Sequence, residues 1–268
     1  MPTTKRSADP RPMENLATMP MAGHLEVLRR MLWRVVCVLS LLTAGVFCLK
    51  GPVFDLLLAP RECDFVTFRA IERLLGAIGQ EFHFEPWHVA LINTELSGQF
   101  MAHVASSFYV AMLLAAPYIL VELFGFVSPA LYERERHLAV RVGGVMYGLF
   151  TIGVAMNYFV LFPISFRFLG TYQVSAEVTN AITLASYIST FTTLTFMMGV
   201  VFQLPLVCWF LGHIGVLSAD VMRRYRRHAL VGIMILAAII TPPDLFTLML
   251  VTGPLYLLYE TSIWVVRK

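Results

Sequence analysis

The chain has 268 residues, of which 58% are hydrophobic and only 14% are charged, and its formal net charge is +3. Water-soluble domains carry about 25% charged residues, so this composition, with a mean hydropathy of +0.72, excludes an ordinary soluble domain. A helix needs about 20 apolar residues to cross the hydrocarbon core of a bilayer. Six uncharged runs recur along the chain, at 35–49, 96–121, 142–166, 178–219, 228–243 and 245–259, and the first and the last two of them are shorter than this length. We therefore expect an all-α polytopic membrane protein.

The N-terminal part predicts a tail, a first span and a long outer loop. Residues 1–23 are polar and rich in proline, lack the pattern of a cleavable signal peptide, and are expected to form a disordered cytoplasmic tail. The first span is expected at 31–49 and an outer loop at 50–96. Two short helices are predicted in this loop. Pro60 ends the first, and the second has an apolar face at helical spacing: Phe65, Phe68, Ile71, Leu75 and Ile78.

The middle of the chain predicts three more spans. The second is expected at 99–123, with a bend at Pro117, and the third at 142–162, where Pro163 should end the helix. An outer loop at 163–186 leads to the fourth span at 187–212.

The last two predicted spans are short. At 1.5 Å per residue, the spans 229–240 and 245–259 would cover about 18 and 22 Å of a core about 30 Å thick. The residues between them, 241–244, read Thr-Pro-Pro-Asp, which predicts a tight outer turn because neither proline continues the helix with full hydrogen bonding. Asp244 is expected to cap the helix that follows.

The basic residues predict the orientation. Fifteen of the 20 Lys and Arg fall in the segments that six spans would place on one side, and membrane proteins keep this excess in the cytoplasm. We therefore expect six spans with both termini in the cytoplasm.

Residues for catalysis, metal or cofactor binding do not stand out. The four cysteines form no disulfide framework, and the Cys and His residues lack metal-ligand spacing. Glycine loops for nucleotides and the common hydrolase motifs are missing. Basic clusters lie only beside the spans, so nucleic acid is not an expected partner, and neither is any cofactor.

The loop after the second span has an unusual composition. It reads Phe126-Val-Ser-Pro-Ala-Leu-Tyr-Glu-Arg-Glu-Arg136 and follows an acid at the helix exit, Glu122. Membrane loops that keep aromatic and charged residues are candidates for ligand recognition. A solvated turn with a helix cap is the ordinary alternative.

Several motifs taken together resemble the TatC family, the multispan core of the twin-arginine protein translocase. The similarity covers about residues 22–264 and rests on order and spacing. The motifs are His24-Leu25 with Leu28-Arg29-Arg30, Ala59-Pro60, the 126–136 loop, Tyr158 to Pro163, Phe202-Gln-Leu-Pro205, the arginines of 223–227, Thr241-Pro-Pro-Asp244, Pro254 and Leu258-Tyr-Glu260.

The resemblance implies a protein of the inner membrane that is not an enzyme. Its relatives bind signal peptides with paired arginines, assemble in several copies with single-span TatA- and TatB-type partners, and move folded proteins using the proton-motive force. Guanidinium groups are best bound by carboxylates. The resemblance assigns signal-peptide binding to Glu135, Phe126, Pro129, Arg29, Glu26 and Glu133. It assigns the translocation groove and its structure to Gln203, Pro205, Pro60 and Tyr158, and partner contact to Thr241, Pro242, Pro243 and Asp244.

The chain departs from the family pattern at three positions. The acid usually found before the first span would stand at Val27, whereas the nearest acid is Glu26, about 100° away around a helix. Gln203 replaces a common Glu in the fourth span, which argues against a proton-carrying role there. Leu248 stands where a polar residue is common.

Two other classes of function fit the sequence less well. A secondary transporter or channel would need ionisable residues along a path, and charges inside the spans are almost absent. An intramembrane enzyme would need a catalytic set at one depth, which Asn157, His103 and Ser106 do not form by spacing.

Overall fold

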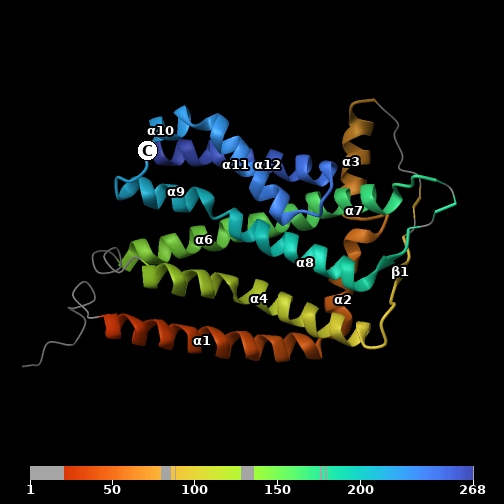
Figure 1. The fold of residues 1–268 in the computed structure, drawn as a ribbon, viewed down its shortest axis with the longest axis horizontal. Coiled ribbons are helices and arrows are strands. Elements are labelled where there is room, and N and C mark those ends of the chain that lie inside the picture. Colours follow the sequence, from red (N-terminus) through yellow and green to blue (C-terminus); the bar gives the residue numbers. More distant parts are fainter. Residues whose placement is uncertain are drawn as a thin grey trace, which may run out of the picture.

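The structure is a computed structural model that describes residues 21–79, 86–87, 89–127, 136–175, 177–178 and 180–267. Helices dominate it, and Figure 1 shows the long ones running roughly alongside one another. The helices are α1 (Met21–Cys48), α2 (Lys50–Leu58), η1 (Ala59–Arg61), α3 (Val66–Ala77), α4 (Gly98–Val127), α6 (Arg136–Met156), η2 (Asn157–Leu161), α7 (Phe162–Thr171), α8 (Leu184–Val201), α9 (Leu204–His213), α10 (Ala219–Arg224), α11 (Arg226–Ile240) and α12 (Leu245–Arg267).

Five stretches among the described residues are long and apolar enough to cross a membrane. They are Leu25–Cys48, Gly98–Leu123, Val142–Thr171, Leu184–His213 and Leu245–Val266. The expected fifth span, 229–240, lies in α11, which has 15 residues and so covers about 22 Å. Many large apolar side chains on these helices are exposed, as expected for surfaces that face lipid.

The helix bounds correct three expectations. Helix α1 begins at Met21, so the last three residues of the expected tail are helical. The helical path of the third span does not end at Pro163 but continues through α7 to Thr171. Helix α12 extends to Arg267 instead of ending at Tyr259, so the expectation of a short helix there was wrong.

Local backbone geometry explains the path across Pro163. The turn before it, η2, is a π-helix in which the amide of Phe162 donates to the carbonyl of Asn157. Such a turn widens the helix locally, and Pro163 then takes a position in the first turn of α7, where a missing N–H costs little.

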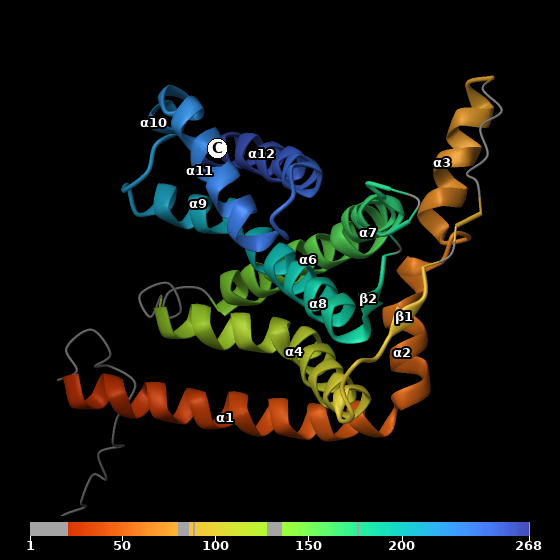
Figure 2. The ribbon, with the colours of Figure 1, turned by 45° about the vertical axis from the view of Figure 1, so that its right-hand side comes forward.

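Prolines shape two other long helices. Pro117 lies inside α4, and Figure 2 shows α4 changing direction along its length. Helices α8 and α9 are separated at Phe202 and Gln203, and Pro205 stands in the first turn of α9. The expected fourth span is therefore two helices.

One end of the bundle carries a cap built from the two loops that were expected on the outer side. Helices α2 and α3 are the two predicted short helices, and α3 projects away from the bundle in Figures 1 and 2. Phe65 and Phe68 are buried at its base, whereas Ile78 beyond its end is 77% exposed. Strands β1 (Leu91–Ile92) and β2 (Ile182–Thr183) pair in parallel and join the two loops of the cap, a contact that the sequence did not predict.

Candidate functional site

The predicted signal-peptide loop is only partly described. Pro129, Glu133 and Glu135 lie outside the described residues. The structure does give the two ends of this loop: Phe126 belongs to the last turn of α4, and Arg136 is the first residue of α6. Both ends lie at the same end of the bundle as the start of α1 and the C-terminal end of the chain in Figure 1.

Glu26 is engaged by its own helix. Its Oε1 atom lies 3.0 Å from Nη2 of Arg29 and 3.4 Å from Nε of Arg30. These pairs follow from the i, i+3 and i, i+4 spacing on one helix face. Of the predicted binding residues, the structure thus brings Glu26 and Arg29 together.

A second carboxylate, Glu122, joins α1 to α4 at the same end of the bundle. Its Oε1 atom accepts a hydrogen bond of 2.9 Å from the hydroxyl of Tyr118 and lies 3.4 Å from Nη1 of Arg34. Tyr118 and Glu122 share a face of α4 because they are one turn apart. The i, i+4 spacing of Tyr118 and Glu122 is visible in the sequence and indicates that the two side chains are neighbours. The sequence does not indicate that Arg34 on α1 is the third member.

The same arrangement occurs between α11 and α12. Arg226 Nη2 donates to Oε2 of Glu260 at 2.7 Å, and Tyr256 donates to Oε1 at 3.1 Å. This pair explains why Glu260 does not end α12: its charge is neutralised by Arg226. Tyr259 adds a hydrogen bond of 2.8 Å to the carbonyl of Met222.

Gln203 lies buried at the break between α8 and α9. Its Nε2 atom donates to the carbonyl of Met146 at 3.1 Å and approaches that of Gly199 at 3.4 Å. Pro205 has no amide hydrogen for the carbonyl of Val201, but the Gln203 side chain bonds to the carbonyls of Met146 and Gly199 instead. Gly199 O is available because the amide of Gln203 donates to Val200 instead. The Oε1 atom has no partner among the described residues.

Helices α6 and α8 approach each other closely beside this site. A Cβ atom added to Gly153 would lie 2.5 Å from the carbonyl oxygen of Met198, and one added to Gly199 would lie 2.5 Å from the ring of Phe150. Small residues permit such contacts between membrane helices. Further along the contact, Asn157 donates to Thr195 at 2.8 Å, and both are buried.

Pro60 and Tyr158 act together in the cap formed by the two loops. Pro60 has no amide hydrogen to offer the carbonyl of Leu56, and the hydroxyl of Tyr158 donates to that carbonyl at 2.9 Å. Tyr187 donates in the same way to the next carbonyl, that of Leu57, at 2.9 Å. Pro163 likewise cannot serve the carbonyl of Phe159, which accepts from Thr67 on α3.

The predicted partner-contact residues form a closed turn. Thr241 is buried, and its hydroxyl donates to Ala237 at 2.9 Å. Asp244 caps α12 as predicted, since its Oδ1 atom accepts from the amide of Thr247 at 2.6 Å. The amide of Asp244 closes the turn by donating to Pro242 at 2.7 Å.

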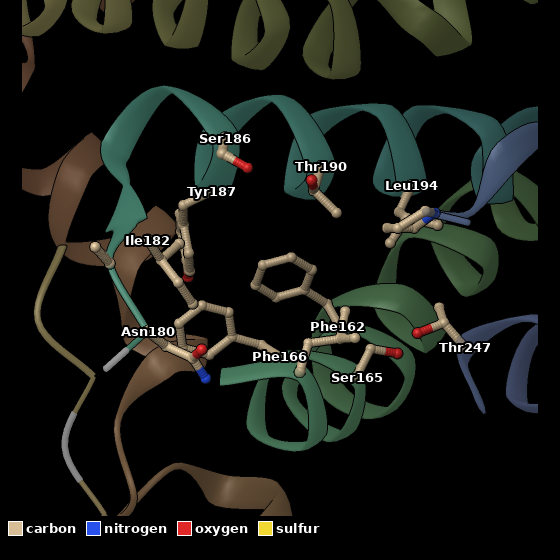
Figure 3. A pocket seen from close by; sticks show the side chains of 13 residues that line it. Phe162, Ser165, Phe166, Asn180, Ile182, Ser186, Tyr187, Thr190, Leu194 and Thr247 are labelled. Carbon is tan, nitrogen blue, oxygen red and sulfur yellow. The ribbon is translucent and has the colours of Figure 1, made fainter. Parts of the chain in front are cut away.

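A cavity of about 320 Å³ adjoins this turn and is lined in part by Pro242. Figure 3 shows the rings of Phe162, Phe166 and Tyr187 pointing into the space between α7 and α8. The buried hydroxyls of Ser165 and Thr247 also line it and have no partner among the described residues. The cavity therefore offers hydrogen-bonding groups beside aromatic and aliphatic side chains.

Comparison with known proteins decides the family. The model of the family "Sec-independent protein translocase protein (TatC)" matches residues 23–254. The chain belongs to the TatC family. A TatC protein of Blattabacterium is 33% identical over 252 residues, which are 92% of this chain and 94% of that protein. The TatC protein of Escherichia coli K12 is 30% identical over 259 residues, 93% of this chain and 89% of that protein.

Solved TatC structures share the fold. A crystal structure of the twin-arginine translocase receptor TatC superposes with a TM-score of 0.70 at 26% identity and covers 91% of this chain and 97% of that chain. A second TatC crystal structure, in DDM, gives a TM-score of 0.72 and covers 91% and 100%. The matched TatC range includes every predicted site residue, from Glu26 to Asp244, and the chain's Val27 and Gln203 are therefore features of a TatC protein.

Proposed function

We propose that this TatC protein is the receptor and core component of a twin-arginine translocase. In this proposal it recognises signal peptides with paired arginines. Together with TatA- and TatB-type single-span partners, it moves folded proteins across the inner membrane using the proton-motive force. The match to the family over residues 23–254 carries the proposal. Two solved relatives described as twin-arginine translocase receptors support it.

The proposed topology has six spans, with α11 as the fifth and both termini in the cytoplasm. What supports it is the charge distribution: the start of α1, the end of α4, the region of α10 and the end of α12 lie at one end of the bundle (Figure 1). These segments hold Arg29, Arg30, Arg34 and the arginines of 223–227. We also propose residues 24–266 as one transmembrane domain that assembles in several copies.

The proposed signal-peptide site is the cytoplasmic loop after α4. Glu135 binds guanidinium, Phe126 and Pro129 shape the loop, and Glu133, Glu26 and Arg29 flank it. Glu26 is expected to contribute least, since Arg29 and Arg30 already neutralise it.

The groove and the partner surface are assigned to different sets of residues. Gln203 and Pro205 form the break in the fourth span, and Pro60 with Tyr158 anchors the outer cap. The Thr241 to Asp244 turn is the proposed contact for a single-span partner. We infer that short α11 thins the bilayer beside this turn, because a helix of about 22 Å does not match the hydrocarbon thickness.

A binding measurement with membranes that contain the full chain tests the proposal. A labelled twin-arginine peptide should bind more tightly than its Lys-Lys version, and Glu135→Ala should weaken binding by about 1–3 kcal/mol, the value of a charge-assisted hydrogen bond. The variant should accumulate and assemble like the parent. Equal binding of the two peptides to the parent would remove the receptor proposal and favour a solute transporter or an intramembrane enzyme.

A further inference from the structure

A ligand with two guanidinium groups is bound best when a carboxylate is available for each one. The resemblance to the TatC family leads us to expect an acid at position 27, where this chain has Val27. Its neighbour Glu26 is held by Arg29 and Arg30. Besides Glu133, which lies outside the described residues, a second carboxylate for the ligand would have to come from elsewhere at this end of the bundle.

Glu122 has the location that this role requires. It lies on α4, one turn before Phe126, and packs against α1 at the end of the bundle where both termini of the predicted loop lie (Figure 1). Its side chain is 22% exposed. The carboxylate is thus shielded enough for its hydrogen bonds to be strong, and open enough for a ligand to reach it.

The contacts of Glu122 leave room for a guanidinium group. Both Tyr118 and Arg34 contact Oε1, and Oε2 accepts no hydrogen bond within the described part of the chain. Arg34 approaches at 3.4 Å, beyond the 2.7–2.9 Å of a good charge-assisted bond. With 62% of its side chain exposed, Arg34 is able to turn away into water.

Tyr256, Glu260 and Arg226 form a second set of the same three residue types, with a shorter bond between the arginine and the carboxylate. Arg226 and Tyr256 contact different oxygen atoms of Glu260, and the Arg226 bond is 2.7 Å long. Both carboxylate oxygens are occupied there, so the set acts as a tie between α11 and α12. The Arg34 contact with Glu122 is longer and occupies one oxygen.

We propose that Glu122 is a second guanidinium-binding carboxylate of the signal-peptide site and that Arg34 occupies it until a twin-arginine peptide displaces Arg34. This inference rests on the proposed receptor function. An incoming arginine can bind Oε1 and Oε2 together in fork geometry, whereas Arg34 contacts Oε1. Tyr118 remains as the donor that holds the carboxylate in position.

The exchange predicts opposite effects for the two partners of one ion pair. Glu122→Gln removes the charge that the peptide binds and should raise the Kd of a labelled twin-arginine peptide about 10-fold or more. Arg34→Gln removes the competitor and should lower the Kd about threefold, since an exposed arginine in such a pair contributes less than about 1 kcal/mol. Arg34→Lys, which keeps the charge but lacks the planar fork, should give a smaller decrease.

The matched control is the set on α11 and α12. Glu260→Gln and Arg226→Gln, measured in the same membranes, should leave the peptide Kd unchanged. Peptides with one arginine replaced by lysine add a second readout. The effect of Glu122→Gln should shrink for one of the two peptides, Arg-Lys or Lys-Arg, and stay for the other.

If Arg34→Gln and Glu122→Gln both weakened binding, the pair would be a structural tie and the inference would be overturned. Unchanged binding in Glu122→Gln would overturn it too. If either of these results is obtained while the parent still binds the twin-arginine peptide more tightly than its Lys-Lys version, the receptor proposal is unaffected. A parent without that preference removes the receptor proposal instead. Amounts of each variant in the membrane and its melting in detergent show whether it is folded.

Discussion

Buried polar side chains in the spans mostly bond to helix carbonyls. Gln203 bonds to Met146 and Gly199, Asn157 to Thr195, and the hydroxyl of Thr195 to the carbonyl of Phe191. Within a bilayer such bonds average about 0.6 kcal/mol. The bonds from Gln203 to Met146 and from Asn157 to Thr195 join separate helical segments without placing a charge in the hydrocarbon.

Gln203→Leu should therefore change stability little, by less than about 1 kcal/mol, because the lost hydrogen bonds are partly offset by removing an unpartnered Oε1 atom. Gln203→Glu should be tolerated at pH 5 and should lower the melting temperature at pH 8, because an ionised carboxylate is costly at this depth. Melting of the purified variants in detergent measures both effects. Full cargo export by Gln203→Leu would mean that polarity at this position serves packing alone.

For single residues, the sequence predicted local roles better than it predicted contacts with residues far along the chain. Asp244 was correctly predicted as a cap because a cap is a local interaction over three residues. The pairing of Glu122 with Arg34 joins residues 88 positions apart, and no local spacing encodes it. Glu135 stays a prediction.

Among the elements, the helix ends that were predicted from prolines were partly correct and partly wrong. Pro60 ends α2 as expected, but Pro163 does not end the helical path, because a π-turn precedes it. A single sequence signals a proline but not whether the preceding turn widens to admit it. The extension of α12 past Glu260 has a similar cause, since its charge is neutralised from another helix.

The pairing of Pro60 with Tyr158 can be tested through Tyr158→Phe. The substitution removes the donor to the Leu56 carbonyl, and a typical intramolecular hydrogen bond contributes about 0.5–1.5 kcal/mol to stability. We expect a lower melting temperature and faster hydrogen exchange in α2. Tyr147→Phe is the matched control, because Tyr147 is exposed.

A double variant sharpens this test. Pro60→Ala restores an amide that can serve the Leu56 carbonyl, so the loss caused by Tyr158→Phe should be smaller in the Pro60→Ala background. Equal losses in the two backgrounds would show that the tyrosine hydroxyl does not compensate for the proline.

For the whole molecule, the proposed orientation predicts which surfaces reagents reach. With the native cysteines replaced, a cysteine at Gly76 on α3 should be labelled from outside, and one at Asp220 on α10 only after the membrane is opened. Both positions are exposed, and a Cβ at Gly76 meets no neighbouring atom. Labelling of the Asp220 position from outside would contradict an arrangement with both termini in the cytoplasm.

The short α11 predicts that membrane thickness matters for transport but not for peptide binding. Four leucines inserted before Thr241 would lengthen α11 by about 6 Å, and four residues turn a helix by about 400°, so the Thr241 to Asp244 turn would be rotated by only about 40°. The longer helix should match the hydrocarbon core and relieve the thinning. Because the proposed peptide site lies at the opposite end of the bundle, this variant should bind a twin-arginine peptide like the parent yet fail to export cargo. Insertion of Gly-Ser-Gly-Ser at the same place, which adds length without an apolar helix, separates thinning from displacement of the turn. If the leucine variant exported cargo normally, the short helix would be a packing feature with no part in transport.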